Sequence, residues 1–234
     1  MTSPASPPRF HAVVVAAGRS TRLGGEVRKS WLELAGRPVL GHTLGAFAAA
    51  PGIAAVVVVA PAEDHEAVGR LAAELGLACS CTEGGATRAD SVRAGLLALG
   101  EQADLVLVHD AARPLVLAED IGRVAAAADR DGAALLASPV RDSLHRAEGE
   151  RVVAPVPREG LWAAETPQAA GRAALLEAME ACRARGESPT DEVTALQATG
   201  ASVTLVRSTE PNPKLTWSGD VPLLESLLLA RQTS

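Results

Sequence analysis

Residues 12–29 read AVVVAAGRSTRLGGEVRK, an apolar run followed by a loop of small and basic residues. The apolar run is typical of a buried strand, and the glycines would let backbone amides approach an anion. Ligands of open α/β sheets bind beyond the carboxyl ends of the strands. The loop is therefore a candidate phosphate site in which Arg22 and Lys29 neutralise charge, although an ordinary solvated basic loop would contain the same residues.

Apolar segments and helical segments alternate along the rest of the chain. Strands are predicted at Ala12–Ala16, Ala54–Ala60, Leu77–Cys81, Asp104–His109, Ala133–Ala137 and Ser202–Val206. Helices are predicted at Val39–Ala49, Glu63–Leu75, Ala86–Leu99, Ala118–Asp129, Arg172–Arg185, Thr190–Thr199 and Gly219–Ala230. This alternation predicts an α/β fold, with one open, doubly wound and mainly parallel sheet covered on both faces.

We expect one domain, residues 10–230, to account for nearly all of the 234 residues, and we expect the Pro/Ser-rich residues 1–9 to be a flexible tail. Residues 142–157 interrupt the alternation with two short arms around a Glu-Gly-Glu tip, which predicts a projecting β-hairpin. A hairpin this small has no core of its own. Either a partner subunit covers it or it lies on its own domain.

Composition excludes several classes of protein. A net charge of −6 argues against a nucleic-acid binder with a broad basic face. The apolar stretch 46–62 is divided by Pro51-Gly52, so no membrane span is expected. The three cysteines fit neither a disulfide framework nor a zinc site, and we expect a cytoplasmic protein.

A second candidate site follows the strand that ends in Val108-His109-Asp110. Asp110 is placed to hold Mg²⁺ together with substrate phosphates, or to cap the turn that follows. His109 is more typical of a satisfied structural residue than of a base. The turn from Gly84 to Ser91 could contact a base edge, although a turn followed by a helix N-cap would look the same.

Motifs that are missing narrow the chemistry further. The sequence has no Walker A loop, no G-x-G-x-x-G fingerprint, no G-x-S-x-G elbow and no H-E-x-x-H motif. A cation-rich loop instead suits transfer onto a phosphate, a nucleophile that is already anionic at neutral pH. Catalysis would then consist of positioning and charge neutralisation.

Taken in order, the motifs resemble the 2-C-methyl-D-erythritol 4-phosphate cytidylyltransferase family from Val13 to about Glu225. They are Ala-Ala-Gly with Arg22 and Lys29, Gly-Gly-x-x-Arg88-x-Asp-Ser91, Val-His-Asp-Ala-Ala-Arg-Pro, Pro-Val-Arg-Asp-Ser, Thr166-Pro-Gln, Thr190-Asp-Glu and Asn212-Pro-Lys214-Leu-Thr216. The resemblance implies a fold of the nucleotide-diphospho-sugar-transferase type. It also implies a Mg²⁺-dependent transfer of CMP from CTP to 2-C-methyl-D-erythritol 4-phosphate, with release of pyrophosphate, in the non-mevalonate isoprenoid pathway.

The same resemblance implies roles for individual residues. The catalytic residues would be Arg22, Lys29, Arg158 and Lys214. The nucleotide would contact Ala16, Ala17, Gly18, Gly85, Arg88, Ser91 and Asp110, and Asp110 would also bind the metal. The acceptor alcohol would contact Arg113, Ser143, Arg158 and Lys214. Because the family is a homodimer with a projecting arm, Ser143 and Arg158 would act in the partner's site.

Some positions depart from the family pattern, and two rival functions stay open. Arg28 stands where the family generally has proline, Ser143 replaces threonine, and Ser30-Trp31 and Pro213 are also unusual, which puts loop geometry in question. One rival is a ribitol-5-phosphate cytidylyltransferase. The other is a nucleotide-binding module without catalysis, and the presence of four charged residues argues against it: Arg22, Lys29, Asp110 and Lys214.

Overall fold

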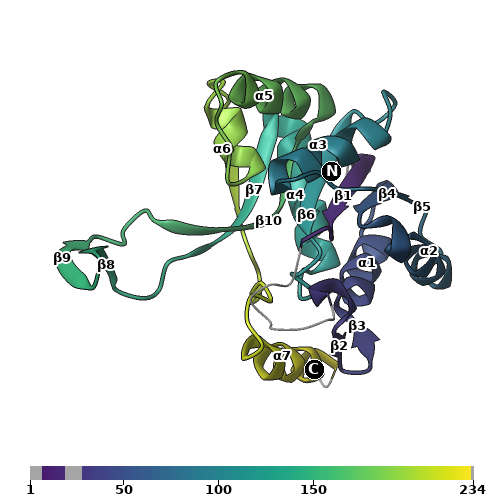
Figure 1. Ribbon diagram of the computed structural model, residues 1–234, viewed down its shortest axis with the longest axis horizontal. Helices are drawn as coiled ribbons and strands as arrows, with labels where there is room; N and C mark the ends of the chain where they lie inside the picture. The colour runs from purple at the N-terminus through teal and green to yellow at the C-terminus, as the bar shows by residue number, and fades with distance from the viewer. Residues whose placement is uncertain (1–6, 19–27, 233–234) are drawn as a thin grey trace, which may run out of the picture.

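The computed structural model describes residues 7–18 and 28–232, and their strands form one main sheet with the order β11-β7-β10-β6-β1-β4-β5 (Figure 1). The strands are β1 Phe10–Val15, β4 Ile53–Val59, β5 Cys79–Thr82, β6 Leu105–Asp110, β7 Ala133–Pro139, β10 Trp162–Gly171 and β11 Thr204–Arg207. All neighbouring pairs are parallel except those that β10 makes with β6 and β7. The predicted α/β class and mainly parallel sheet are therefore confirmed.

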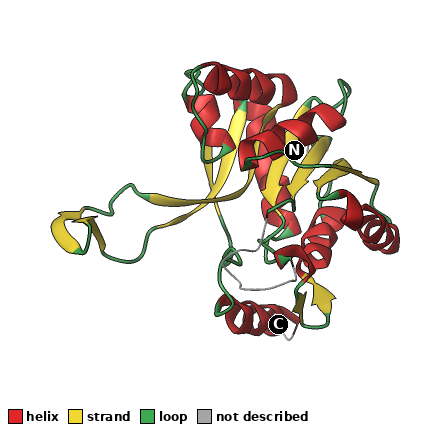
Figure 2. Cartoon of the chain, viewed as in Figure 1, coloured by secondary structure: helices red, strands yellow, loops and turns green. Residues whose placement is uncertain are grey.

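Helices lie on both faces of this sheet (Figure 2). The helices of the described residues are α1 Val39–Ala49, α2 His65–Glu74, α3 Arg88–Ala98, α4 Ala118–Asp131, α5 Arg172–Ala184, α6 Glu192–Gln197 and α7 Asp220–Gln232, with the 3₁₀ turns η2 Lys29–Trp31 and η3 Ala62–Asp64. The predicted helices and strands are present, with ends that differ by no more than two residues. In the described ranges, 7–18 and 28–232, no helix has the length and hydropathy needed to cross a membrane.

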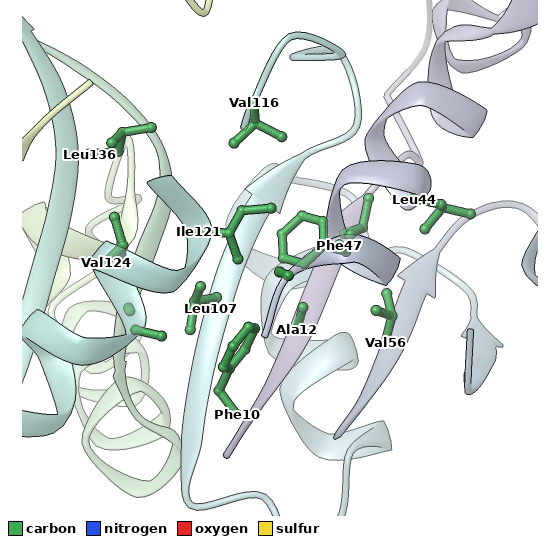
Figure 3. Close-up of a cluster of buried hydrophobic side chains, with 14 of the residues drawn as sticks. Phe10, Ala12, Leu44, Phe47, Val56, Leu107, Val116, Ile121, Val124 and Leu136 are labelled. Carbon is green, nitrogen blue, oxygen red and sulfur yellow. The ribbon is translucent and has the colours of Figure 1, made fainter. Parts of the chain in front are cut away.

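Two apolar cores sandwich the sheet. Phe10 and Leu107 pack with Phe47 of α1 and Ile121 of α4 on one face (Figure 3). Apolar residues of α3, α5 and α6 pack with strand residues such as Val13 and Val106 in the other core, most of whose members are Val, Leu and Ala. There α3 approaches β1 so closely that a Cβ at Gly95 would lie 2.4 Å from Val13. Because Gly95 has no Cβ, α3 and β1 can pack this closely.

Strand β10 was not predicted, and it lies in the middle of the sheet. Its sequence, WAAETPQAAG, carries Glu165, Pro167 and Gln168, which are depleted in strands. Its register against β7 shifts between Ala164 and Gln168, on either side of the proline, which has no N–H for the ladder. The polar side chains are buried at this break and face partners that lie far away in the sequence.

The predicted hairpin is present as β8 Leu144–Glu148 and β9 Arg151–Val156. It extends away from the body of the molecule at the end of two long connections (Figure 1). Gly149 closes the tip with a φ of 58°. Below the main sheet in the view of Figure 1, α7 packs with the small β2 Glu33–Leu34 and β3 Arg37–Pro38 hairpin over a separate apolar cluster.

Candidate active site

A pocket lies where β1 and β6 end, as the parallel strand order predicts. Four segments that are far apart in the sequence meet there: the end of β1, the 3₁₀ turn η2, the end of β6 and the segment before α7. The lining residues are Val15, Ala16, Gly18, Lys29, Ser30, Asp110, Ala111, Ala112, Lys214 and Leu215. The pocket thus joins both predicted loops and both lysines of the chain.

Asp110 is the central charge of the pocket and is 8% exposed. Its Oδ1 accepts a hydrogen bond from Arg88 Nε at 3.0 Å, and its Oδ2 accepts one from Lys214 Nζ at 2.6 Å. Burial alone would raise the pKa of Asp110, but Arg88 and Lys214 outweigh it and hold that pKa well below its usual range. Asp110 is therefore ionised at any pH near neutrality.

Arg88 connects Asp110 to a second buried carboxylate. Its Nη1 and Nη2 donate to the two oxygens of Glu192 at 2.7 and 3.2 Å, and Glu192 is 1% exposed. Arg88 begins α3 and Glu192 begins α6, so this planar fork ties two helices to the end of β6. In the structure, Arg88 fixes the orientation of Asp110.

His109 forms part of a hydrogen-bond chain that holds the turn after β6. The Asp110 N–H donates to Thr166 Oγ1 at 3.1 Å, and that hydroxyl lies 3.0 Å from His109 Nδ1. His109 Nε2 lies 3.3 Å from the carbonyl oxygen of Arg113, which can only accept, so Nε2 carries the proton. Burial lowers the pKa of His109 to about 4. A neutral imidazole with a hydrogen bond at each ring nitrogen fits the structural role expected for His109.

Lys214 is positioned by buried polar contacts of the segment before α7. Asn212 Nδ2 donates to Glu165 Oε2 at 3.2 Å and to the Thr166 carbonyl oxygen at 3.1 Å. On the other side of Lys214, the Leu215 N–H donates to the Ala112 carbonyl oxygen at 2.8 Å. Contacts on both sides of Lys214 therefore direct its side chain to Asp110.

Lys29 reaches the same pocket from η2, and its Nζ donates to the Thr216 carbonyl oxygen at 2.9 Å. Thr216 is fixed in turn by Asp220, which accepts from the Thr216 N–H at 2.7 Å and from its hydroxyl at 2.8 Å. The predicted catalytic residue Arg22 lies outside the described residues.

The predicted nucleotide turn lies beside the end of β1. A Cβ at Gly84 would lie 2.5 Å from the Cβ of Ala17, so the two loops touch. The Ser91 hydroxyl accepts from the Gly85 N–H at 3.2 Å and donates to the Thr87 carbonyl oxygen at 2.9 Å. Thr87 caps α3 with a complete capping box. Ser91 shapes this turn, and its contact with nucleotide stays a prediction.

Of the residues predicted to bind the acceptor, Lys214 lines the pocket, and Arg113 follows the lining residue Ala112 without lining the pocket itself. Arg113 Nη1 donates to the Asn212 carbonyl oxygen at 2.7 Å, which ties Arg113 to the segment that carries Lys214. Ser143 and Arg158 are exposed at the base of the arm and do not line the pocket of their own chain. Arg158 donates to the carbonyl oxygen of Arg141. Within one chain, these two residues are not brought together with Asp110.

Among the described residues that line the pocket, Asp110 is the one carboxylate that could bind a metal. In the part of the chain that the structure describes, no three His, Cys, Asp or Glu side chains lie close enough together to hold an ion. Mg²⁺ often uses only one or two carboxylates, with water and substrate phosphates completing its coordination. Asp110 fits that use because it is ionised and lines the pocket.

The sequence predicted no role for several motif residues that the structure places around the site. Glu192 orients Arg88, Thr166 links Asp110 to His109, and Asn212 anchors the segment of Lys214. The signal for them was that each lies in one of the quoted motifs, Thr166-Pro-Gln, Thr190-Asp-Glu or Asn212-Pro-Lys214. Their partners could not be named because those contacts cross the sheet.

Comparison with known proteins finds relatives that match nearly the whole chain. The family model described as 2-C-methyl-D-erythritol 4-phosphate cytidylyltransferase matches residues 10–230. A protein of that name from Cereibacter sphaeroides is 44% identical over 218 residues, which is 93% of this chain and 96% of the relative. One from Acidithiobacillus ferrooxidans is 43% identical over 234 residues, covering 95% and 98%. The crystal structure of the Thermus thermophilus protein of that name matches with a TM-score of 0.79 and 36% identity, covering 94% of this chain and 98% of that one.

Proposed function

The chain belongs to the 2-C-methyl-D-erythritol 4-phosphate cytidylyltransferase family, and we propose that the pocket around Asp110 is where it carries out the reaction of that family. The chain is a nucleotidyltransferase that transfers CMP from CTP to 2-C-methyl-D-erythritol 4-phosphate. The products are 4-diphosphocytidyl-2-C-methyl-D-erythritol and pyrophosphate. The assignment of the active site to this pocket rests on one observation: Lys29, Asp110 and Lys214 line it together.

The reaction makes one bond and breaks one at the α-phosphorus of CTP. An oxygen of the acceptor phosphate forms the new bond, and pyrophosphate leaves with the electrons of the old one. The acceptor oxygen is already anionic, so no general base is required. Neutral, buried His109 agrees with a site that works through cations instead.

We assign the cations to two tasks. Lys29 and Arg22 neutralise the charge that develops at the α-phosphate, while Lys214 and Arg113 hold the acceptor phosphate. Asp110 would hold Mg²⁺, which when bound neutralises further charge on the phosphates. Arg88 keeps Asp110 oriented through its own pairing with Glu192.

The nucleotide would lie along the backbone at the end of β1. Ala16, Ala17 and Gly18 leave that backbone open, and Gly84, in the turn from Gly84 to Ser91, touches Ala17 from the side. Small residues there favour close approach of cytidine and its phosphates to main-chain amides.

We propose that the arm completes the site in a homodimer. Ser143 and Arg158 are exposed at its base, and Val152 and Val153 on β9 are 67% and 46% exposed. Trp162, at the start of β10, is 38% exposed. Apolar exposure of this kind on a two-stranded arm favours burial against a second copy, which would bring Arg158 to the partner's pocket.

A cytoplasmic location is part of the proposal. The cysteines Cys79, Cys81 and Cys182 are free, as is usual where thiols are kept reduced.

Pyrophosphate release from CTP and Mg²⁺ tests the function directly, with 2-C-methyl-D-erythritol 4-phosphate and ribitol 5-phosphate as competing acceptors. We expect strong preference for the former. Preference for ribitol 5-phosphate would keep the mechanism and refute the acceptor, whereas no turnover with either would refute the reaction.

A further inference from the structure

Arg28, which directly precedes Lys29, has partners that the sequence did not suggest. Its Nη1 donates to both carboxylate oxygens of Asp64, each at 2.9 Å, and its Nη2 donates to Glu63. Both acids belong to η3, the turn that follows β4. The side chain therefore joins the segment that carries Lys29 to the main sheet.

This ion pair is sheltered from solvent. The side chain of Arg28 is 31% exposed and that of Asp64 is 13% exposed, although Glu63 is 64% exposed. By contrast, the nearby Arg70–Glu66 pair on α2 has exposed fractions of 64% and 86%. An ion pair that is sheltered from solvent, and in which the guanidinium bonds both carboxylate oxygens, fixes the relative position of its two side chains more than an exposed pair does.

The backbone of Arg28 is also engaged. Its carbonyl oxygen accepts from the Trp31 N–H at 2.9 Å and so closes the 3₁₀ turn that begins at Lys29. The ammonium of Lys29 lies at the far end of its side chain, 2.9 Å from the Thr216 carbonyl oxygen. Lys29 is thus anchored at its backbone through Arg28 and at its tip through Thr216.

We propose that Arg28 is a positioning residue that acts through Lys29, because its pairing with Asp64 and Glu63 fixes the backbone from which Lys29 enters the pocket. This inference rests on the proposed function, in which Lys29 neutralises charge in the transition state. It gives the departure from the family pattern at Arg28 a specific role.

The first test needs no catalysis. The chain has two lysines, Lys29 and Lys214, so mild acylation followed by peptide mass spectrometry compares them within one molecule. In Arg28→Ala, the labelling rate of Lys29 relative to Lys214 should rise about fivefold, the ratio that corresponds to losing one sheltered ion pair. Arg70→Ala removes the exposed pair as a matched control and should leave the ratio at the wild-type value. An unchanged ratio in Arg28→Ala overturns the proposal.

The second test uses kinetics with both substrates. Arg28→Ala should lower kcat by about 10- to 100-fold, the scale expected for a misplaced catalytic group, while Arg28→Lys retains part of the activity. In a Lys29→Ala background, Arg28→Ala should cause no further loss, because there is then no lysine to position. Equal factors in both backgrounds would show that Arg28 acts independently of Lys29 and would overturn the proposal.

The two failures are distinguishable. If the wild-type protein does not release pyrophosphate from CTP with 2-C-methyl-D-erythritol 4-phosphate, the proposed function fails. The labelling ratio still tests whether Arg28 fixes the position of Lys29. A thermal melt of Arg28→Ala within a few degrees of wild type shows that the fold is intact, so that the kinetic change reports on the site.

Discussion

Lys214 Nζ lies 2.6 Å from Oδ2 of Asp110, while Arg88 Nε lies 3.0 Å from Oδ1. The two cations differ in freedom. Arg88 is also bound to the buried Glu192, whereas the Lys214 side chain is 39% exposed on the open side of the pocket. Of the two cations bound to Asp110, we therefore expect Lys214 to move to an incoming phosphate and Arg88 to remain bound to Asp110.

Lys214→Ala is expected to weaken binding of the acceptor more than binding of CTP. A hydrogen bond between charged groups contributes about 1.5–3 kcal/mol, so KM for 2-C-methyl-D-erythritol 4-phosphate should rise by about 10- to 100-fold. Steady-state kinetics with each substrate varied in turn separates the two constants. A rise confined to KM for CTP would instead assign Lys214 to the nucleotide.

Glu192→Ala should destabilise the fold, because it leaves the buried end of Arg88 without its carboxylate. Removing one partner of a buried pair costs about 3–5 kcal/mol, which urea denaturation at pH 7.5 measures. Glu180→Ala is the matched control, since Glu180 pairs with Arg93 at the surface and is 47% exposed. The control should lose at most about 1 kcal/mol. Similar losses in both variants would show that the Arg88–Glu192 pair is no more important than a surface pair.

Lys29→Ala should lower kcat by about 10²-fold or more, the scale for removing one donor to a developing charge. KM for CTP should change much less, because the contact strengthens in the transition state. Pre-steady-state measurement of pyrophosphate release isolates the chemical step. A near-normal rate for that step would remove Lys29 from the transition state.

The fold could be predicted where one segment carries its own signal. The strands β1 and β6, which are short apolar runs, and the amphipathic α4, which has a helical period, are examples. Strand β10 could not be recognised, since its Glu165, Pro167 and Gln168 contradict strand propensity. Gln168 is accommodated only because it donates to Asp191 and accepts from the Val193 N–H, contacts that no local pattern contains.

The site likewise contains residues that the sequence predicted and contacts that it did not. Lys29, Asp110 and Lys214 were predicted because each falls in a recognisable motif, and the structure places all three around one pocket. The pairing of Asp110 with Arg88, and of Arg28 with Asp64, was not predicted. These pairs join segments across the sheet, and their distances depend on the assembled fold.

The protonation of His109 predicts a pH dependence of stability. Its pKa is about 4 in the fold, below the ordinary value of 6.5, so the unfolded chain binds the extra proton between these values. Stability from this residue is present above pH 6.5 and is lost as the pH falls toward 4. Between about pH 7.5 and about pH 5 the loss is about 2 kcal/mol.

Urea denaturation of wild type and His109→Gln at both pH values measures this loss. Glutamine does not titrate, so the variant should lose about 2 kcal/mol less than wild type over the interval. Asp110 contributes little there, because Arg88 and Lys214 keep its pKa far below that interval in the fold. Equal losses in the two proteins would show that His109 is not held neutral.

The arm leads to a prediction about mixed dimers. Arg158→Ala retains a complete pocket, and Lys29→Ala retains a complete arm, so one mixed dimer assembles one intact site from the two chains. Equal amounts of the inactive variants, after exchange of subunits, give mixed dimers as half of the total, each with one working site of two. About a quarter of wild-type activity should therefore return.

Differently tagged variants, purified through both tags, isolate the mixed dimer and should show about half of the wild-type activity. Arg158→Ala mixed with Arg158→Ala Lys29→Ala is the matched control, because no intact arm is then present and no recovery is expected. Inactive mixed dimers would place Arg158 in the pocket of its own chain. A protein that stays monomeric at micromolar concentration would refute the shared site altogether.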